Sequence, residues 1–273
     1  EFRRVLFRSQ LNVATHVAVT FDLWTSRSVD QYVGLTAHFI NSQFQLKSYV
    51  LVNVEIPPPH TGEAVAEKVQ EILTEWGIQN KVQFVVADNG ANCIKAIRLM
   101  NKVFVPCMAH TLHLAVGKGL AAGIDSVLTK CSKVAEFFHR SAAAKYCLEE
   151  KQRSLGLPIE KLIIKCDTRW NSVFNMLQRI VVQQQAVVAT LLQLNRRDMF
   201  PEADMVTVES LLKVLKPFKE VTEDFSSEKG VTLSLLLPTL ISLQSQLQEE
   251  EDEEAVISNI KHAMRESLDT RYT

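Results

Sequence analysis

Several features that would point to other classes of protein are missing from this sequence. Its five cysteines contain no Cys-x-x-Cys pair, so they give no sign of a disulfide framework, and reduced thiols in cytoplasm or nucleus are expected. Charged or polar residues interrupt every apolar segment before the length of a membrane span, and no signal-peptide pattern opens the chain. The sequence therefore indicates a soluble protein of the cell interior that has no membrane partner.

An excess of positive charge is missing as well. The chain has 30 lysine and arginine residues against 31 aspartate and glutamate residues, which gives a net charge of −1. Because a compact nucleic-acid-binding domain usually has a basic excess, any such surface must be a local patch or lie outside this chain. The 273 residues, 47% of them hydrophobic, are enough to bury one large core or two modest ones.

The first nine residues, EFRRVLFRS, differ abruptly from the rest of the chain. Because a common restriction site encodes Glu-Phe, one interpretation is a segment added during cloning, and the other is an ordinary basic amphipathic lead-in. Residues 1–11 are therefore set apart as a lead-in that is either non-native or disordered.

The segment from Val17 to Glu55 has the pattern of β-strands. The runs VAVTFDLW, YVGLTAHFI and FQLKSYVLVNVEI are rich in β-branched and aromatic residues and are separated by short polar links. They predict three successive antiparallel strands. Three prolines at 57–59 end the third strand, and Thr61 is the predicted N-cap of a helix that runs to Trp76 and is followed by Gly77.

Two further strands come next, each joined to a helix. QFVVAD is predicted as a buried strand, closed by the turn Asp88-Asn89-Gly90 before a helix over 91–100. Val103 to Pro106 is predicted as a strand before a helix that begins near Ala109. Three antiparallel strands extended by parallel ones through helical crossovers are the order of an RNase H-like α/β mixed sheet.

The second half of the chain is predicted to be all-α, because apolar residues between Val173 and Phe218 keep a helical period. The acidic run 249–254 is predicted to be a solvated linker or helix face. These patterns divide the chain into an incomplete RNase H-like core over 12–122 and a helical domain over 123–273 that contains the acidic loop.

Asp22 stands in the first predicted strand, where the neighbouring residues favour burial. An unpaired buried carboxylate costs several kcal/mol, so this side chain must be exposed, paired or bound to a metal. Strand alternation places Thr20, Asp22 and Trp24 on one face, and Val19 and Phe21 on the other. Two interpretations stay open, a residue on the polar face of the sheet or a metal ligand.

Asp88 ends the fourth predicted strand, and ligands in open α/β sheets bind beyond the carboxyl ends of parallel strands. Asp-Asn-Gly is also a good turn sequence, so turn formation is the alternative role. The predicted sheet order brings Asp22 and Asp88 side by side. Two such carboxylates could hold Mg²⁺ or Mn²⁺ for phosphodiester cleavage and strand transfer.

Cys107, His110 and His113 lie in the segment PCMAHTLHLAV and raise the question of a zinc site. A structural zinc site needs four ligands, usually from two spaced pairs, and the sequence offers no obvious second pair. We therefore expect no zinc site in this segment and interpret these residues as packing and hydrogen-bonding groups at the start of a helix.

The segment Asp167-Thr168-Arg169-Trp170-Asn171 opens a strong helical pattern. In one interpretation, Asp167 or Thr168 caps the helix and Trp170 anchors it by packing. In the other, an exposed Trp170 stacks on an unpaired base while Arg169 contacts phosphate.

Taken together, these motifs resemble the hAT superfamily of DNA transposases and the domesticated transposon proteins derived from them, including the BED zinc-finger proteins. The resemblance covers nearly all of the chain from about residue 12. It rests on five segments in this order: FDLWTS, VVADNGANCIKA, PCMAHTLHLAV, CDTRWNSVFNMLQRI and LLKVLKPFKEVTEDFS.

The resemblance implies a catalytic role for the two aspartates. In hAT transposases the first-strand Asp and the Asp that ends the fourth strand are two of three catalytic metal ligands, and they correspond to Asp22 and Asp88. The implied cofactor is Mg²⁺ or Mn²⁺, the implied partner is DNA, and the implied location is the nucleus.

The resemblance also implies roles for two further motifs. The family's Cys-x-x-His motif lies near the active site and corresponds to Cys107 and His110. Its Arg-Trp pair, implicated in handling a flipped base, corresponds to Arg169 and Trp170 as DNA-binding residues. The helices after the fifth strand resemble the insertion domain that interrupts the RNase H-like fold.

The chain departs from the family pattern in two places. The family's third catalytic acid is a Glu in a Ser-Glu-Arg context within the dimerisation region, and the chain lacks that motif, since Glu251, Glu253 and Glu254 stand in another context. The N-terminal BED zinc finger is missing too. We therefore expect a two-Asp remnant of the strand-transfer site without transposition, and any homo-oligomer to form through the missing C-terminal region.

The motifs leave three hypotheses about function. The first is a transposase-type nuclease core that binds metal ions. The second is a domesticated, non-catalytic scaffold that binds DNA or chromatin or regulates transcription. The third, an unrelated cytosolic α/β protein with a helical appendage, conflicts with the ordered set of motifs.

Overall fold

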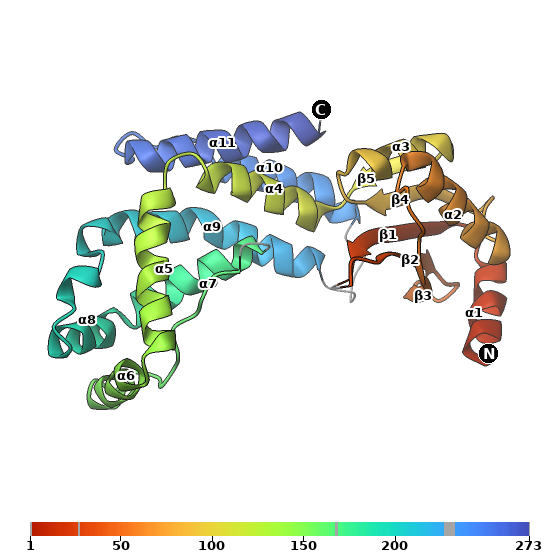
Figure 1. Cartoon of the computed structure of the whole chain (residues 1–273). Coiled ribbons are helices and arrows are strands. Elements are labelled where there is room, and N and C mark those ends of the chain that lie inside the picture. The colour runs from red at the N-terminus through yellow and green to blue at the C-terminus, as the bar shows by residue number, and fades with distance from the viewer. Residues whose placement is uncertain (1, 27, 167–168, 227–232, 273) are drawn as a thin grey trace. The chain divides into compact units, whose positions relative to one another are not determined.

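The chain folds into two compact units, shown in the computed structural model of Figure 1, which describes residues 2–26, 28–166, 169–226 and 233–272. The contacts divide the chain between Thr111 and Leu112, inside helix α4. The sequence patterns had placed the end of the core at residue 122, eleven residues later. The first unit is built on a sheet, and the second is built from helices.

The first unit contains a five-stranded mixed sheet. The strands are β1 (Val17–Thr25), β2 (Gln31–Ile40), β3 (Leu46–Glu55), β4 (Val82–Ala87) and β5 (Val103–Pro106). They lie in the order β3-β2-β1-β4-β5. The pairs β1–β2 and β2–β3 are antiparallel, whereas β1–β4 and β4–β5 are parallel. The predicted mixed sheet of three antiparallel strands extended by parallel ones is therefore confirmed.

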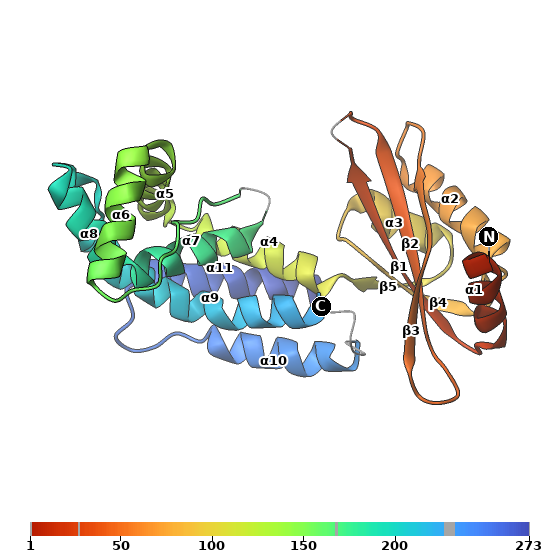
Figure 2. The same cartoon turned by 90° about the horizontal axis from the view of Figure 1, so that it is seen from below.

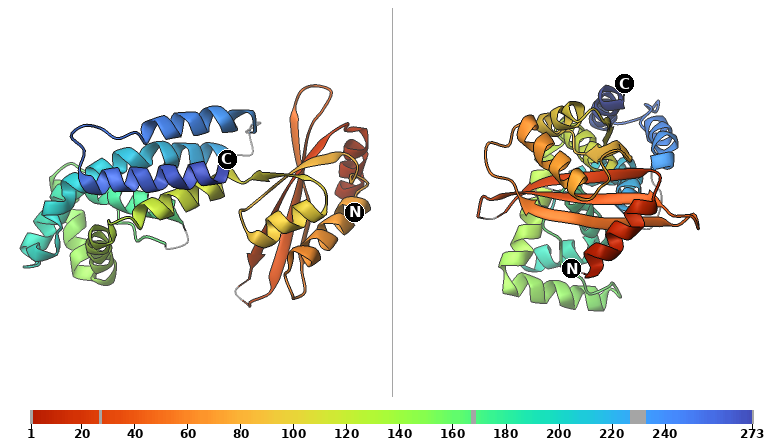
Figure 3. Two further views of the ribbon diagram at one scale, coloured as in Figure 1. Left: turned by 90° about the horizontal axis from the view of Figure 1, so that it is seen from above. Right: turned by 90° about the vertical axis from the view of Figure 1, so that its right-hand side faces the viewer.

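Helices cover one face of this sheet. They are α1 (Phe2–Val13), α2 (Gly62–Glu75) and α3 (Ala91–Leu99), and α4 (Met108–Leu120) begins in this unit. Figure 3 shows α2 and α3 lying across the strands, and in Figure 2 the strands lie in front of them. Val19, Phe21 and Leu35 are buried in the core on the covered face. Alternation along β1 therefore places Val19 and Phe21 on the covered face and Thr20 and Asp22 on the opposite face.

The opposite face of the sheet is polar. Thr20 Oγ1 lies 3.1 Å from His38 Nε2, and His38 Nδ1 lies 2.9 Å from Ser48 Oγ, so a row of hydrogen bonds crosses β1, β2 and β3. These side chains are only partly buried. This face can therefore present polar groups to a ligand without leaving them unpaired.

Local sequence signals explain the ends of α2. The hydroxyl of Thr61 accepts a hydrogen bond from the Ala64 amide, as an N-cap does. Gly77 follows the helix with φ of +69°, a conformation that favours glycine. Both features agree with the prediction from the sequence.

The segment set apart as a lead-in is ordered and forms α1. Phe7 stacks on Tyr49 with ring centroids 4.1 Å apart, and Leu11 is fully buried. Arg8 donates to the Glu75 carbonyl over 2.6 Å and lies over the Trp76 ring. An amphipathic helix therefore forms where a disordered lead-in was one expectation, because its apolar side has a surface to pack on.

The described residues of the second unit form helices joined by turns and loops, with no strand among them, as the sequence predicts. Its helices are α5 (Asp125–Arg140), α6 (Ala142–Ser154), α7 (Trp170–Val182), α8 (Gln184–Gln193), α9 (Met205–Phe225), α10 (Leu236–Gln246) and α11 (Ala255–Tyr272), and its short 3₁₀ turns are η1 (Arg197–Met199) and η2 (Glu202–Asp204). A third 3₁₀ turn, η3 (Leu233–Leu235), contains the boundary between the two units. Figures 1 and 2 show α10 and α11 alongside α9. Leu177, Phe218 and Met264 are fully buried in this unit.

The acidic run 249–254 connects α10 to α11 and is only partly solvated. Glu253 pairs with the buried Lys261 over 2.5 Å, and Thr207 donates to Glu254 over 2.6 Å. The expectation of a solvated linker is therefore wrong for these two glutamates, because polar groups on other helices bring them into contact with the unit.

Across the described residues no helix is long and apolar enough to span a membrane.

Candidate functional site

The parallel pairing of β1 with β4 positions Asp22 and Asp88. Thr20 is aligned with Val86, and each aspartate lies two residues further along its strand direction. Neighbouring strands lie about 4.8 Å apart, so the two carboxylates occupy the same end of the sheet. The structure therefore brings together the two acids that the sequence singled out.

Both acids line one open pocket of about 530 Å³ on the polar face of the first unit. Its walls come from three strands and from the segment after β5. The lining residues are Thr20, Phe21, Asp22, Trp24, Gly34, Thr36, Val86, Ala87, Asp88, Cys107 and His110. The pocket therefore contains both acids and both residues of the Cys-x-x-His motif.

The surroundings of Asp22 disfavour its negative charge. Partial loss of water raises the pKa of this carboxyl, and the nearby charge of Asp88 raises it further. The backbone amide of Leu23 and the charge of His110 act in the opposite direction but do not cancel these effects. The repulsion between the two like charges of Asp22 and Asp88 is what a bound cation would relieve.

Asp88 also forms the turn that the sequence predicted. Its Oδ1 accepts a hydrogen bond from the Gly90 amide over 2.9 Å, and a Cβ at Gly90 would lie 2.9 Å from the same oxygen. The neighbouring Asn89 donates to Thr111 over 3.0 Å. The turn and ligand interpretations of Asp88 are therefore compatible, because the turn fixes the carboxylate at the pocket.

Cys107 is held at the pocket by the backbone. Its amide donates to the Ala87 carbonyl over 2.8 Å, which continues the pairing of β4 and β5 by one residue. His110 comes three residues later, in the first turn of α4. Within the described residues, no three His, Cys, Asp or Glu side chains gather in a group able to hold a metal ion.

Seven of the eleven lining residues of the pocket were not singled out as site residues from the sequence, and Trp24 and Gly34 are two of them. Trp24 is 37% exposed, and Gly34 lies beneath its ring. The sequence signal for Trp24 is strand alternation, which places its side chain on the same face as that of Asp22. Gly34 comes from β2 and could be found only once the register of β1 and β2 was known.

Arg169 and Trp170 belong to the second unit, at the start of α7. Trp170 is 5% exposed, and its indole Nε1 has no hydrogen-bond partner among the described residues. Stacking on a base needs an exposed ring, so this burial favours the packing interpretation of Trp170. The predicted caps Asp167 and Thr168 lie outside the described residues.

Two family models match this chain. The model described as the ZBED1 RNase-like domain matches residues 20–112, and the ZBED1 RNase-like helical domain matches residues 105–214. The first match contains the whole pocket and all or most of each of the five strands. The second begins at the end of β5 and continues into α9.

Similar proteins are found in animals and plants. Zinc finger BED domain-containing protein 4 of Homo sapiens is 24% identical over 264 residues, which are 92% of this chain and 22% of that protein. Zinc finger BED domain-containing protein RICESLEEPER 2 of Oryza sativa subsp. japonica is 24% identical over 271 residues, 93% of this chain and 37% of that protein. The Zea mays protein named "Putative AC transposase" is 24% identical over 260 residues, 86% of this chain and 31% of that protein.

This chain thus spans well under half the length of these relatives. The sheet order, the helical unit after it and both family matches agree with the ordered sequence motifs. The chain belongs to the family of BED zinc-finger proteins derived from hAT transposases.

Proposed function

We propose that this chain is a nucleic-acid-binding part of a hAT-type transposase-like protein, with a two-aspartate remnant of a metal-dependent strand-transfer site. The observation that carries the proposal is the position of Asp22 and Asp88 at one end of adjacent parallel strands, in the same open pocket. DNA is the proposed partner, and the nucleus the proposed location.

The donor groups of the pocket suit a hard divalent cation. Mg²⁺ and Mn²⁺ prefer oxygen ligands, and Asp22 and Asp88 offer carboxylate oxygens whose like charges repel each other. These two side chains would hold the ion. A divalent ion bound there would act as a Lewis acid that polarises a phosphoryl oxygen of the nucleic acid.

The composition of this pocket also supports the proposal that the chain does not cleave DNA. Catalysis in this family uses three acids, and among the described residues only Asp22 and Asp88 line the pocket as carboxylates. His110 and Cys107 are softer donors that do not replace a third carboxylate for Mg²⁺. The proposal is therefore a site that binds a cation and nucleic acid without cleaving DNA.

Binding of Mn²⁺ followed by calorimetry tests the proposal. The chain should bind Mn²⁺, and Asp22→Asn and Asp88→Asn should each weaken that binding by roughly 10- to 100-fold or more, since even outer-shell losses cost this much. Glu67→Gln, an exposed carboxylate of α2 outside the pocket, is the matched control and should bind as the unaltered chain does. Absence of Mn²⁺ binding, or equal binding by all variants, would contradict the proposal.

A domesticated scaffold is the second candidate function. It is favoured by the lack of a three-residue metal-binding group among the described residues. In that case the chain binds DNA with the same affinity in Mg²⁺ and in chelator, and Asp22→Asn leaves the affinity unchanged. Both candidate functions exclude DNA cleavage by this chain. Cleavage of a labelled DNA that is lost in Asp22→Asn would contradict both of them.

A further inference from the structure

The helical unit has a pocket of its own, of about 200 Å³, between α5, α6 and the segment that connects α6 to α7. Each of these three parts contributes one basic and one apolar residue. The lining residues are His139 and Phe138 of α5, Lys145 and Leu148 of α6, and Lys161 and Leu162 of the connecting segment. No carboxylate is among these lining residues. Basic and apolar groups therefore meet in one small pocket.

The turn between α5 and α6 forms one corner of the pocket. Ser141 ends α5 and begins α6, and its hydroxyl accepts a hydrogen bond from the Ala144 amide over 3.1 Å, as an N-cap does. Lys145 and Leu148 follow in the first turns of α6. Because residues three apart share one face of a helix, both side chains can line the same pocket.

Side chains of the neighbouring helices hold the connecting segment in place. His139 Nε2 donates to the Leu162 carbonyl over 2.7 Å, and Arg179 Nη1 donates to the Lys161 carbonyl over 2.7 Å. The buried Gln152 donates over 2.8 Å to the carbonyl of the residue before Lys161. The lining part of this segment is neither helix nor strand. These bonds therefore fix the pocket wall in advance, which lowers the ordering cost of binding a ligand.

Two arginines of the same region are already paired with carboxylates. Arg140, the last residue of α5, pairs with Glu136 over 2.9 Å, and Arg179 pairs with Glu160 over 3.1 Å. At such short distances each glutamate cancels much of the field of its arginine. These arginines therefore contribute little positive charge to a ligand.

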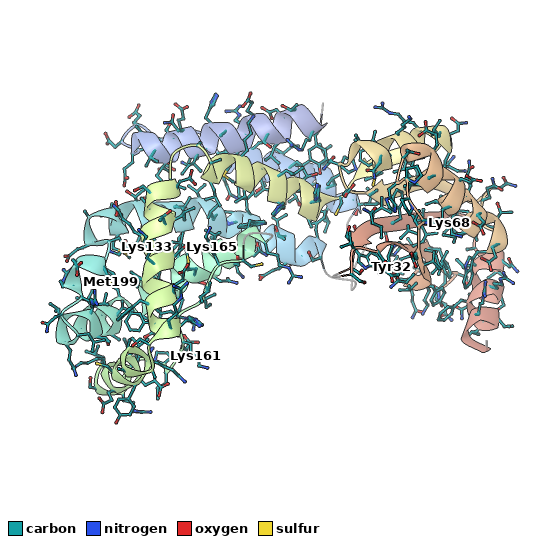
Figure 4. All side chains as sticks on the ribbon, in the orientation of Figure 1. Tyr32, Lys68, Lys133, Lys161, Lys165 and Met199 are labelled. Carbon is teal, nitrogen blue, oxygen red and sulfur yellow. The ribbon has the colours of Figure 1, made fainter. Side chains whose placement is uncertain are left out.

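The two lysines of the pocket are compensated much less. Lys145 Nζ lies 4.0 Å from Glu149 Oε1, at the outer limit of an ion pair, and Glu149 also contacts Arg153 over 3.7 Å. Lys161, labelled in Figure 4, forms no ion pair with any residue that the structure describes. Both lysine side chains are exposed. The pocket therefore offers two positive charges to a ligand.

The size and the lining of the pocket indicate the kind of ligand. Sites for small molecules and cofactors usually have about 300 to 1,000 Å³, so a volume of about 200 Å³ suits a single side chain. Phe138, Leu148 and Leu162 are only 4%, 3% and 2% exposed. A side chain in contact with them is removed from water, which favours an apolar one. Lysines beside it favour carboxylates through charge complementarity.

We propose that this pocket binds a short acidic peptide segment of a partner protein. A leucine-like side chain of the segment enters the pocket, and carboxylates on either side of it contact Lys145 and Lys161. The peptide is additional to the nucleic acid of the proposed function and binds the other unit of the chain. A nucleic-acid strand fits less well, because it presents phosphates along its whole length and needs a row of uncompensated basic groups.

Methyl NMR of the unaltered chain with a defined peptide tests the proposal. The probe is a capped eight-residue peptide of alternating glutamate and leucine, titrated into protein labelled at the leucine methyl groups. The signals of Leu148 and Leu162 should shift, and those of Leu268, fully buried in α11, should not. A peptide with serine in place of leucine should bind roughly 10-fold more weakly or worse, the effect of losing one buried leucine side chain.

Lysine variants test the contribution of charge. Lys145→Gln and Lys161→Gln should each weaken peptide binding by roughly 1.5- to 5-fold, the usual effect of one exposed ion pair. The double variant should lose about the product of the two effects. Lys213→Gln, at an exposed lysine of α9 outside the pocket, is the matched control and should bind as the unaltered chain does. Added salt should weaken binding to the unaltered chain.

Several outcomes would overturn the peptide site. They are unshifted methyl signals of Leu148 and Leu162, equal binding of the serine peptide, and unchanged affinity in the double lysine variant. An oligodeoxynucleotide that displaces the peptide and loses affinity in the same variants would assign the pocket to phosphate instead. Purely structural lysines would change the free energy of unfolding but not the peptide affinity. Binding of Mn²⁺ at the aspartates is measured separately, so the proposed function can stand when the peptide site fails.

Discussion

The two carboxylates of the pocket differ in the interactions that surround them. Asp88 is engaged by the Gly90 amide within its turn, whereas Asp22 has a raised pKa caused by partial desolvation and by the charge of Asp88. Functional sites often contain charged groups that lower the stability of the folded protein. The destabilisation caused by the Asp22 charge can be measured as a change in the free energy of unfolding.

Replacing Asp22 by Asn should stabilise the chain at neutral pH in chelator. Because the folded-state pKa of Asp22 is raised, its ionised form opposes folding at every pH well above that value, and the penalty disappears once the carboxyl is protonated. The gain in unfolding free energy should therefore be present at neutral pH and vanish in acid below the unfolded pKa of about 3.9. Denaturant unfolding under both conditions measures it, with Glu67→Gln as the control. A less stable Asp22→Asn at neutral pH would contradict this interpretation.

The cysteines should differ sharply in reactivity. Burial, helped by the charge of Asp204, raises the pKa of Cys131 to about 12, and burial with the nearby Asp88 raises the pKa of Cys93 as well. Cys166 is exposed. Because the thiolate is the reactive form, iodoacetamide in mildly alkaline buffer should modify Cys166 in the native chain and leave Cys93 and Cys131 unmodified. Peptide mass spectrometry reports each site, and early modification of Cys131 would be the opposite result.

At the scale of elements, the link between the acidic run and α11 is the least expected feature of the second unit. The Lys261 side chain is 3% exposed, and its ammonium contacts Glu253 and Glu250 over 2.5 and 3.3 Å. The two glutamates differ in burial, at 12% and 80% exposure. This difference allows a matched comparison at one lysine.

Glu253→Gln should destabilise the second unit more than Glu250→Gln. Loss of the buried partner leaves the Lys261 charge with one exposed carboxylate and should lower the unfolding free energy by about 2 to 4 kcal/mol. Loss of the exposed partner should cost less than about 1 kcal/mol. Denaturant titrations of both variants make the comparison. Equal effects would show that burial of Glu253 is not what stabilises the contact.

The same contact has a predicted pH dependence. Burial lowers the pKa of Lys261, but hydrogen bonds to Glu253 and Glu250 outweigh it, so the pKa is raised. A raised lysine pKa means that the stabilisation is complete below the unfolded value of about 10.4 and is lost as the pH rises through the folded value. The stability difference between the unaltered chain and Lys261→Met should therefore be constant from neutral to mildly alkaline pH and shrink above the unfolded value. A difference that grows with pH would contradict it.

Sequence patterns predicted the elements better than the contacts between them. Alternation predicted the faces of Asp22 and Trp24 because a strand has a period of two in any surroundings, and Thr61 predicted a helix start through its own hydroxyl. The burial of Trp170 and the pairing of Glu253 with Lys261 depend on how separate helices pack. Such packing leaves no local signal in the chain.

For the candidate site as well, some contacts could be predicted from the sequence and others required the structure. Asp22 and Asp88 could be paired from the sequence because the order of strands predicts which of them are neighbours. The contact of Gly34 with Trp24 required the register of β1 and β2. The ordered motifs indicated the family, although they did not reveal which indole is exposed.

At the scale of the whole molecule, a net charge of −1 limits what nonspecific electrostatics contribute to DNA binding. Any electrostatic contribution to the proposed DNA binding would therefore come from a local basic patch, and the proposed function is argued from one pocket. That pocket lies entirely within the first unit and within the match to the RNase-like domain. The central claim about it is that Asp22 and Asp88 act together on a divalent cation.

Anomalous diffraction from crystals soaked in Mn²⁺ tests this claim most directly. If the two aspartates act together, an anomalous peak will lie within coordination distance of both the Asp22 and the Asp88 carboxylates, and it will be lost in crystals of Asp88→Asn. A peak bound elsewhere in the chain, or no peak at saturating Mn²⁺, would contradict the claim.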